Sequence, residues 1–285
     1  MTGLCRAGQL LMVGFAPEEM EEVRSLASQG RLGGVILFER NARTSLEVAR
    51  LTSQLIAVQA PVPPLVVAVD QEQGRVCRIR EGVTLFPGPS ELGLLRRPAT
   101  TARVARWVAL ELSCLGINLN LAPVADLPET TPWPPVLEGR AFGQEPFQVA
   151  SQVAAWVRGS QGAGVASCVK HFPGHGSVKG DTHRELPEDV SAEEKILGHH
   201  LVPFKAALEA GVCCVMISHV VYPALDPNGP ASLSPRLVGG LLRGAMGFQG
   251  LVLTDDLDMG AVASSLDPVE AVVKAIQAGV DLALV

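Results

Sequence analysis

The residues best suited to chemistry lie in one glycine-punctuated segment, residues 170–183, with the sequence KHFPGHGSVKGDTH. It holds three histidines, two lysines and an aspartate. Imidazole side chains titrate near neutral pH, so they can donate or accept protons under physiological conditions. Catalytic groups are often carried on loops that a rigid scaffold holds in place. We therefore expect residues 170–183 to form a functional loop.

Within this segment His183 is the candidate proton donor, and Asp181 is the candidate partner that orients its ring. An imidazole can protonate a leaving oxygen and later deprotonate water without a large pKa shift. The Asp-x-His spacing alone is common, and a surface hydrogen bond also explains it. His171 and His175 have the four-residue spacing of zinc ligands on a helix, but the intervening Pro-Gly pair disfavours a helix. We expect no metal site and no cofactor, and keep a zinc site as the minor alternative.

Composition narrows the possible partners. The 285 residues carry a net charge of -6, which argues against nucleic acid as a partner because such binders present a dense basic face. The six cysteines are scattered without a C-x-x-C pattern, so neither a disulfide framework nor a zinc knuckle is indicated. No apolar run approaches the roughly 18 residues that a membrane helix requires. We expect a cytoplasmic protein that has no contact with a membrane and acts on a small molecule.

Eight short apolar runs alternate with longer helical patterns and predict eight strands. These are residues 10–15, 34–38, 65–69, 118–122, 165–169, 214–217, 251–254 and 282–285. Strands that are apolar on both faces and are joined by helices predict a parallel sheet. Eight such units close most naturally into a barrel, so we predict an α/β fold with one catalytic (β/α)8 TIM-type barrel domain over residues 1–285. A doubly wound open sheet is the alternative.

Helix ends are marked by capping signals and glycines. The expected starts are Thr44 with Glu47, Ser191 with Glu194, and Asp267 before Pro268. Gly116, Gly211 and Gly279 stand where helices should end. The sequence stops after the eighth strand, so we expect the final helix of the barrel to be missing and apolar surface to be left uncovered there.

Polar residues collect where the predicted strands end. They are Asp70 after the third strand, Asp126 after the fourth, Lys170 and His171 at the fifth, His219 after the sixth and Asp255 after the seventh. The active sites of (β/α)8 barrels lie at this end of the strands. A glycosidase needs a carboxylate on one side of the sugar and a proton donor on the other. We take Asp255 as the candidate carboxylate, with a loop cap as its alternative role.

Four motifs resemble glycoside hydrolase family 3, and most of all its bacterial β-N-acetylglucosaminidase (β-hexosaminidase) branch. They are DQEQGRVCR at 70–78, GRAFG at 139–143, KHFPGHGSVKGDTHRELP at 170–187 and GFQGLVLTDDLDMG at 247–260. The motifs occur in the family's order and cover nearly the whole chain. One departure is Gln73, which stands where the branch usually has a glycine.

The resemblance implies a role for each matching residue. Asp255 corresponds to the nucleophile that forms a covalent glycosyl-enzyme, and Asp181 with His183 to the acid/base pair. The residues implied to bind the non-reducing N-acetylglucosamine are Asp70, Arg78, Arg140, Lys170 and His171. Family 3 β-glucosidases take a glutamate acid/base from a second domain, whereas this chain carries the histidine donor of the hexosaminidase branch.

The resemblance thus implies a retaining exo-β-N-acetylglucosaminidase that acts on peptidoglycan-derived muropeptides in cell-wall recycling, as a monomer. A phosphorylase with the same site is the nearest alternative, because a neutral histidine repels phosphate less than a carboxylate does. A sugar-binding protein that is catalytically impaired by the missing helix is a second alternative, and a zinc hydrolase is a third.

Overall fold

The computed structural model describes residues 7–41, 43–57, 64–176, 178, 187–263 and 266–285. Its centre is a parallel sheet with the strand order β11-β8-β7-β6-β3-β2-β1-β12. The strands are β1 (Leu11–Gly14), β2 (Gly34–Leu37), β3 (Val66–Val69), β6 (Leu119–Asn120), β7 (Ala166–Phe172), β8 (Cys214–Ile217), β11 (Leu251–Thr254) and β12 (Ala283–Leu284). A parallel bridge between Leu253 and Leu282 joins the two ends of the sheet. The predicted (β/α)8 barrel is confirmed, and the open doubly wound sheet is wrong.

Successive side chains along each strand point to opposite faces, and both faces are buried here. Met12, Ile36 and Met216 belong to the apolar cluster inside the barrel. Val35 and Val215, their neighbours along the chain, belong to the larger cluster between the barrel and the helices. This double burial is the reason that the strands could be recognised as continuous apolar runs.

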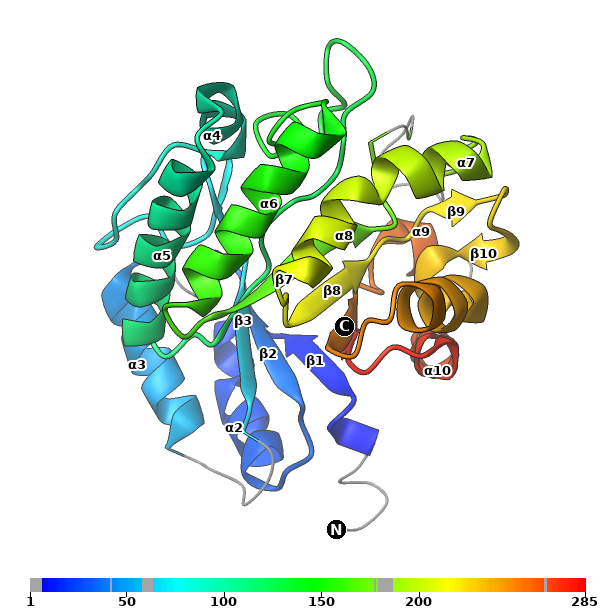
Figure 1. Ribbon diagram of the computed structural model, residues 1–285. Helices are drawn as coiled ribbons and strands as arrows, with labels where there is room; N and C mark the ends of the chain where they lie inside the picture. Colours follow the sequence, from blue (N-terminus) through cyan, green and yellow to red (C-terminus); the bar gives the residue numbers. More distant parts are fainter. Residues whose placement is uncertain (1–6, 42, 58–63, 177, 179–186, 264–265) are drawn as a thin grey trace.

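Helices cover the outside of the barrel, and Figure 1 shows α5 and α6 lying side by side against it. The α-helices are α2 (Met20–Ser28), α3 (Ser45–Ile56), α4 (Pro89–Leu95), α5 (Pro98–Cys114), α6 (Pro146–Gln161), α7 (Glu193–Lys195), α8 (Val202–Glu209), α9 (Gly260–Ala263) and α10 (Pro268–Ala278). The 3-10 helices are η1 (Pro17–Glu19) and η3 (Ala231–Leu233), and the π-helices are η2 (Ile196–His200) and η4 (Arg236–Ala245).

Two of the three predicted helix starts are confirmed. Thr44 caps α3 in a capping box with Glu47, and Asp267 caps α10 by accepting a hydrogen bond from the Val269 N–H. The capping box predicted at Ser191 is wrong. The N-cap of α7 is Ala192, and the Ser191 N–H is donated to the Asp189 carboxylate instead. A local aspartate turn therefore takes the place of the expected serine cap.

Two short antiparallel hairpins extend from the barrel. One pairs β4 (Gln71–Gln73) with β5 (Val76–Cys77) directly after β3, and the other pairs β9 (Val221–Tyr222) with β10 (Asp226–Pro230) after β8. The first hairpin matters for function because it begins next to Asp70, at the end of a barrel strand. It turns the chain so that β4 and β5 border the same end of the barrel as Asp70.

An apolar hollow of about 520 Å³ lies between α2, β1 and α10. Leu10, Leu26 and Val273 are among the residues that line it. It lies beside β1, the strand that pairs with β12. Among the described residues, no helix is both long enough and apolar enough to span a bilayer. The assignment of residues 1–285 to one catalytic domain stays a prediction.

Candidate active site

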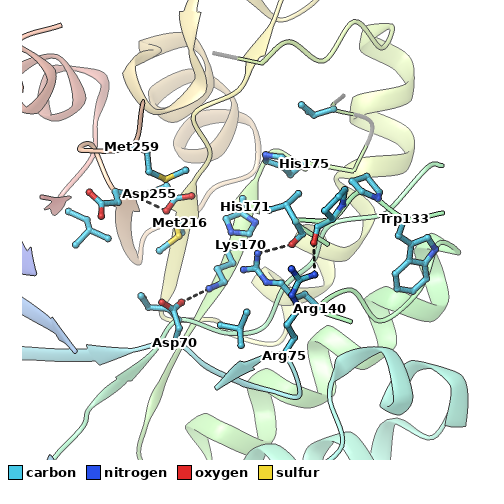
Figure 2. A pocket seen from close by; sticks show the side chains of 18 of the residues that line it. Asp70, Arg75, Trp133, Arg140, Lys170, His171, His175, Met216, Asp255 and Met259 are labelled. Atoms are coloured by element: carbon cyan, nitrogen blue, oxygen red, sulfur yellow. Dashed lines mark hydrogen bonds and ion pairs between the residues drawn. The ribbon is translucent and has the colours of Figure 1, made fainter. Parts of the chain in front are cut away.

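A cavity of about 900 Å³ opens at the carboxyl ends of the barrel strands. All six described residues that were predicted for the site line it: Asp70, Arg78, Arg140, Lys170, His171 and Asp255. Figure 2 shows Lys170 and His171 near the centre of the cavity, Asp70 below them and Asp255 at one side. Residues that are up to 185 positions apart in the chain, from 70 to 255, thus meet in one cavity at the strand ends. Asp181 and His183 lie outside the described residues.

The floor of the cavity is an ion-pair network centred on Lys170. Its ammonium nitrogen lies 2.7 Å from a carboxylate oxygen of Asp70 and 2.7 Å from one of Glu72. Arg140 contacts Glu72 through two hydrogen bonds of 2.9 and 2.8 Å. Arg78 lies 3.6 Å from Asp70 and is a weaker partner. The network fixes Asp70 at the end of β3 and holds it toward the cavity.

These groups keep their charges in spite of burial. Burial alone would raise the pKa of the Glu72 carboxyl, but Arg140 and Lys170 together hold its pKa well below the ordinary value. Burial would likewise lower the pKa of Lys170, but Asp70 and Glu72 raise it. The pKa of Arg140 is raised by Glu72 against the same opposing effect. The floor of the cavity is thus a set of fixed charges suited to hydrogen-bonding sugar hydroxyls.

A second network orients His171. The Asp126 carboxylate lies 2.7 Å from the Nδ1 of His171 and accepts the backbone N–H of His175 at 2.7 Å. Asp126 is completely buried, and His171 and His175 hold its pKa below the ordinary value against the effect of burial. Among the described residues the Nε2 of His171, the other ring nitrogen, has no hydrogen-bond partner, and His171 lines the cavity.

Asp255 follows β11, and its backbone N–H donates to the Ile217 carbonyl of β8. Its side chain is half-buried at the cavity wall. Burial opposes the charged form, but His171, His219 and Lys170 lower the pKa of Asp255 overall. One oxygen also accepts the N–H of Asp256 at 2.9 Å. Asp255 is therefore a fixed anion beside the charges of the cavity floor, which is the form that a nucleophilic carboxylate requires.

His219 holds the backbone of the cavity wall next to Asp255. Its Nδ1 lies 2.7 Å from the Ser232 hydroxyl, and its Nε2 lies 2.9 Å from the Asp256 carbonyl. The second contact holds the backbone directly after Asp255. Burial lowers the pKa of His219, so the ring is neutral at neutral pH. Its Nε2 can then carry the proton that is donated to the Asp256 carbonyl.

The structure explains how Gln73 fits at a position where the family motif usually has a glycine. Its φ is +74°, in the left-handed region where glycine is favoured. Its buried side chain accepts a hydrogen bond from the Phe86 N–H at 3.1 Å. The turn of the β4–β5 hairpin therefore keeps the backbone conformation that a glycine would adopt, with the glutamine side chain anchored against the next loop.

Sequence reasoning gave no role to Glu72 or Asp126, although both hold the predicted residues in place. A signal was present in each case, because an acidic residue within a few positions of the end of a buried strand must find a cation or hydrogen-bond donor if it is buried too. The partners, Arg140 and His171, could not be identified because they come from distant parts of the chain. Trp133, in the proline-rich loop 128–135, also lines the cavity.

Comparison with known proteins identifies the family. The model for the glycosyl hydrolase family 3 N terminal domain matches residues 5–285. The chain belongs to glycosyl hydrolase family 3. The resemblance predicted from the four motifs is thus confirmed, and the family 3 chain is a glycoside hydrolase with its candidate residues at the expected end of a barrel.

Relatives are similar over most of the chain. A protein named β-hexosaminidase from Alkalilimnicola ehrlichii is 40% identical over 281 residues, which are 96% of this chain and 79% of that protein. One named β-hexosaminidase from Stenotrophomonas maltophilia is 37% identical over 97% of this chain and 83% of its own.

Solved structures agree with this assignment. A family 3 β-N-acetylglucosaminidase from Paenibacillus sp. superposes with a TM-score of 0.96 at 39% identity, and this chain spans 55% of its length. NagZ from Neisseria gonorrhoeae, solved in complex with N-trifluoroacetyl-D-glucosamine, superposes with a TM-score of 0.86 at 35% identity over 97% of this chain and 80% of its own.

Proposed function

We propose that this chain is a retaining exo-β-N-acetylglucosaminidase. It removes terminal β-linked N-acetylglucosamine from peptidoglycan-derived muropeptides and passes through a covalent glycosyl-enzyme. The names of its relatives and the sugar analogue bound in the Neisseria structure support the sugar that it removes. The muropeptide substrate, a role in cell-wall recycling, a cytoplasmic location and a monomeric state are parts of the same proposal.

Asp255 is the proposed nucleophile. Its carboxylate attacks the anomeric carbon of the bound sugar, and the bond to the leaving oxygen breaks on the opposite face. The proposal rests above all on one observation: this half-buried carboxylate shares a cavity with a separate set of fixed charges while its pKa is kept low. An anion at neutral pH can attack without first losing a proton.

Asp70, Arg78, Arg140, Lys170 and His171 are the proposed binding residues for the terminal sugar. The Asp70 carboxylate accepts hydrogen bonds from ring hydroxyls, and Lys170, held 2.7 Å from Asp70, donates to a neighbouring oxygen. Because the network is formed before substrate arrives, little side-chain freedom remains to be lost on binding. His171 offers its free ring nitrogen to the same sugar.

His183 is the proposed acid/base, with Asp181 as its partner. In the first step His183 gives a proton to the leaving oxygen as the C1–O bond breaks. In the second step it takes a proton from water, which attacks C1 and releases Asp255. The stereochemistry at C1 is inverted twice and is therefore retained.

The test is hydrolysis of an aryl N-acetyl-β-glucosaminide. Asp255→Ala should lower kcat by on the order of 10³-fold or more, because the nucleophile is lost. Asp258→Ala, an exposed acid in the same loop, is the matched control and should keep nearly full activity. If Asp255→Ala stays within a few-fold of the parent, the assignment of the nucleophile is wrong.

The same assay distinguishes the hydrolase from a phosphorylase. In phosphate buffer a phosphorylase releases a sugar 1-phosphate, whereas a hydrolase releases the free sugar at an unchanged rate. Calorimetry that detects binding of N-acetylglucosamine without any turnover would instead support a sugar-binding protein.

A further inference from the structure

The β9–β10 hairpin contacts both ends of the segment that carries the proposed acid/base pair. Asp181 and His183 belong to residues 177–186, which lie outside the described residues apart from Val178. The hairpin extends from the barrel after β8 (Figure 1). Two neighbouring residues of β9 make the contacts, and neither has a role in the reaction proposed above.

The end of this segment is held by the backbone of Val221. The Val221 N–H donates to the Pro187 carbonyl at 3.0 Å, and the Val221 carbonyl accepts the Asp189 N–H at 2.8 Å. Glu188, between these two residues, forms a parallel bridge with Val221. The two backbone hydrogen bonds fix the direction in which the chain leaves the segment. Pro187, the first described residue after it, is therefore anchored directly to β9.

The start of the segment is held by the side chain of Tyr222. Its hydroxyl donates to the Gly174 carbonyl at 2.7 Å. The Gly176 carbonyl accepts the Glu129 N–H at 3.1 Å, and a Cβ on Gly176 would lie only 1.5 Å from the Leu127 carbonyl oxygen. The chain therefore enters the segment through closely packed backbone, and Tyr222 is its contact with the hairpin.

The hydroxyl of Tyr222 is not explained by packing. Tyr222 is completely buried, and its hydroxyl lies closer to the Gly174 carbonyl than to the Ser218 hydroxyl, which is 3.3 Å away. Burial raises the pKa of Tyr222 well above its ordinary value, so the hydroxyl keeps the proton that it donates. The sequence has one tyrosine and eight phenylalanines. Because a phenylalanine would fill the same space, the hydroxyl is there for the hydrogen bond.

We propose that Tyr222 is a positioning residue for the acid/base. Its hydroxyl and the neighbouring Val221 backbone hold the two ends of one segment, and so set the position from which His183 protonates the leaving oxygen. The proton moves from His183 to that oxygen as the C1–O bond breaks, and Tyr222 is not among the residues that line the cavity. A displacement of about 1 Å at a reacting group can cost roughly 10²-fold in rate. The inference rests on the proposed function, because it needs His183 to be the acid/base.

The experiment compares two aryl N-acetyl-β-glucosaminides that differ in how much they need the acid. A 2,4-dinitrophenolate leaves readily without protonation, whereas phenol leaves only with a proton from the acid. Tyr222→Phe removes the hydroxyl and keeps the ring. It should lower kcat/KM about tenfold for the phenyl glycoside and less than about twofold for the dinitrophenyl glycoside, because general acid catalysis contributes roughly 10²–10⁴-fold in all. Equal losses for the two glycosides, or no loss for either, would overturn the proposal.

A double mutant shows whether Tyr222 acts through His183. His183→Ala should itself give the selective loss, and to a greater extent than Tyr222→Phe. Adding Tyr222→Phe to His183→Ala should then change kcat/KM for the phenyl glycoside by less than about twofold, because the effects of residues that act together do not add. The same loss in both backgrounds would mean that the hydroxyl only stabilises the fold, and the proposal would be wrong.

Two controls separate positioning from general damage. Thr52→Val removes another buried hydroxyl, which donates to the Leu115 carbonyl at 2.7 Å, and should alter kcat/KM for neither glycoside. The inhibition constant of free N-acetylglucosamine reports on the proposed sugar-binding residues and should be nearly unchanged in Tyr222→Phe. A rise of this constant in parallel with the loss of kcat/KM would show that the cavity floor has moved, which contradicts the proposal.

Failure of the inference can be told from failure of the proposed function. If the parent hydrolyses neither glycoside, or if His183→Ala lacks the selective loss, the proposed function or its acid/base is wrong and the inference fails with it. If His183→Ala shows the selective loss and Tyr222→Phe does not, the proposed function stands and the inference alone is wrong.

Discussion

At the scale of single residues, the charges of the cavity floor depend on one another. Glu72 is 1% exposed and is the common partner of Arg140 and Lys170. Arg140 is tolerated in the interior because this carboxylate is ionised, and Lys170 because both Glu72 and Asp70 are ionised. Glu72 is therefore a positioning residue: it does not need to touch the sugar, but it holds two groups that are proposed to bind it.

Glu72→Gln should lower the free energy of unfolding by about 3 kcal/mol, because it leaves two buried cations short of a counter-charge. Affinity for N-acetylglucosamine should fall in parallel as Lys170 and Arg140 lose their fixed positions. Urea denaturation measures the first effect and calorimetry the second. Glu270→Gln breaks an exposed pair with Lys274 and should cost less than about 0.5 kcal/mol. Equal effects of the two variants would contradict this account.

Gln73 offers a second test, because its left-handed backbone lowers the stability of the fold whereas its hydrogen bond raises it. Gln73→Ala keeps the unfavourable φ of +74° and loses the bond to the Phe86 N–H. Gln73→Gly loses the same bond but relieves about 1 kcal/mol of backbone strain. We expect both variants to be less stable than the parent and the glycine variant to be the more stable of the two. The reverse order in urea denaturation would show that the turn is not strained.

At the scale of elements, helix α3 should depend on its N-cap. Thr44 accepts the Glu47 N–H at 3.2 Å, whereas Ser191 makes no such bond to α7. Thr44→Ala should therefore lower the free energy of unfolding by about 1 kcal/mol. Ser191→Ala, at a cap that the sequence predicted and the structure lacks, should cost less than about 0.5 kcal/mol. Thermal unfolding of the two variants makes the comparison, and similar losses would mean that the cap at Thr44 contributes nothing.

The elements also show what the sequence could and could not reveal. All eight barrel strands were predicted, because strands buried on both faces read as apolar runs. The β4–β5 hairpin was missed because both strands are short and β4 is wholly polar, and its pairing depends on the turn at Gln73 and Gly74. The prediction that Asp70 and Asp255 meet at the strand ends is confirmed, because both line one cavity. The contacts between Glu72 and Arg140 were not predictable, because 68 positions separate them in the chain.

At the scale of the whole molecule, buried titratable groups set the pH range of stability. Burial lowers the pKa of His175, His200 and His219 below the ordinary value of 6.5, so these rings resist protonation in the folded state. Below pH 6.5 the unfolded chain binds more protons than the folded one, and stability falls. Asp126 and Asp255 have lowered pKa values, so they too make the folded state less stable as the pH falls below about 3.8. Asp256, whose pKa burial raises, opposes them weakly.

Groups with raised pKa values determine how stability changes at alkaline pH. Burial raises the pKa of the Cys213 and Cys214 thiols above 9.0 and that of Tyr222 well above 10.0. In the unfolded chain these groups lose protons at their ordinary pKa values, so stability falls as the pH rises above about 9.

We expect the free energy of unfolding to be highest between about pH 7 and 8.5. It should decline gradually below pH 6.5 and more steeply below pH 4. Urea denaturation from pH 3.5 to 10 measures this profile. Because most of the responsible groups are buried, 0.5 M salt should leave the shape of the profile nearly unchanged. A maximum at the isoelectric point near 5.6, or a profile that salt flattens, would instead assign the pH dependence to surface charge.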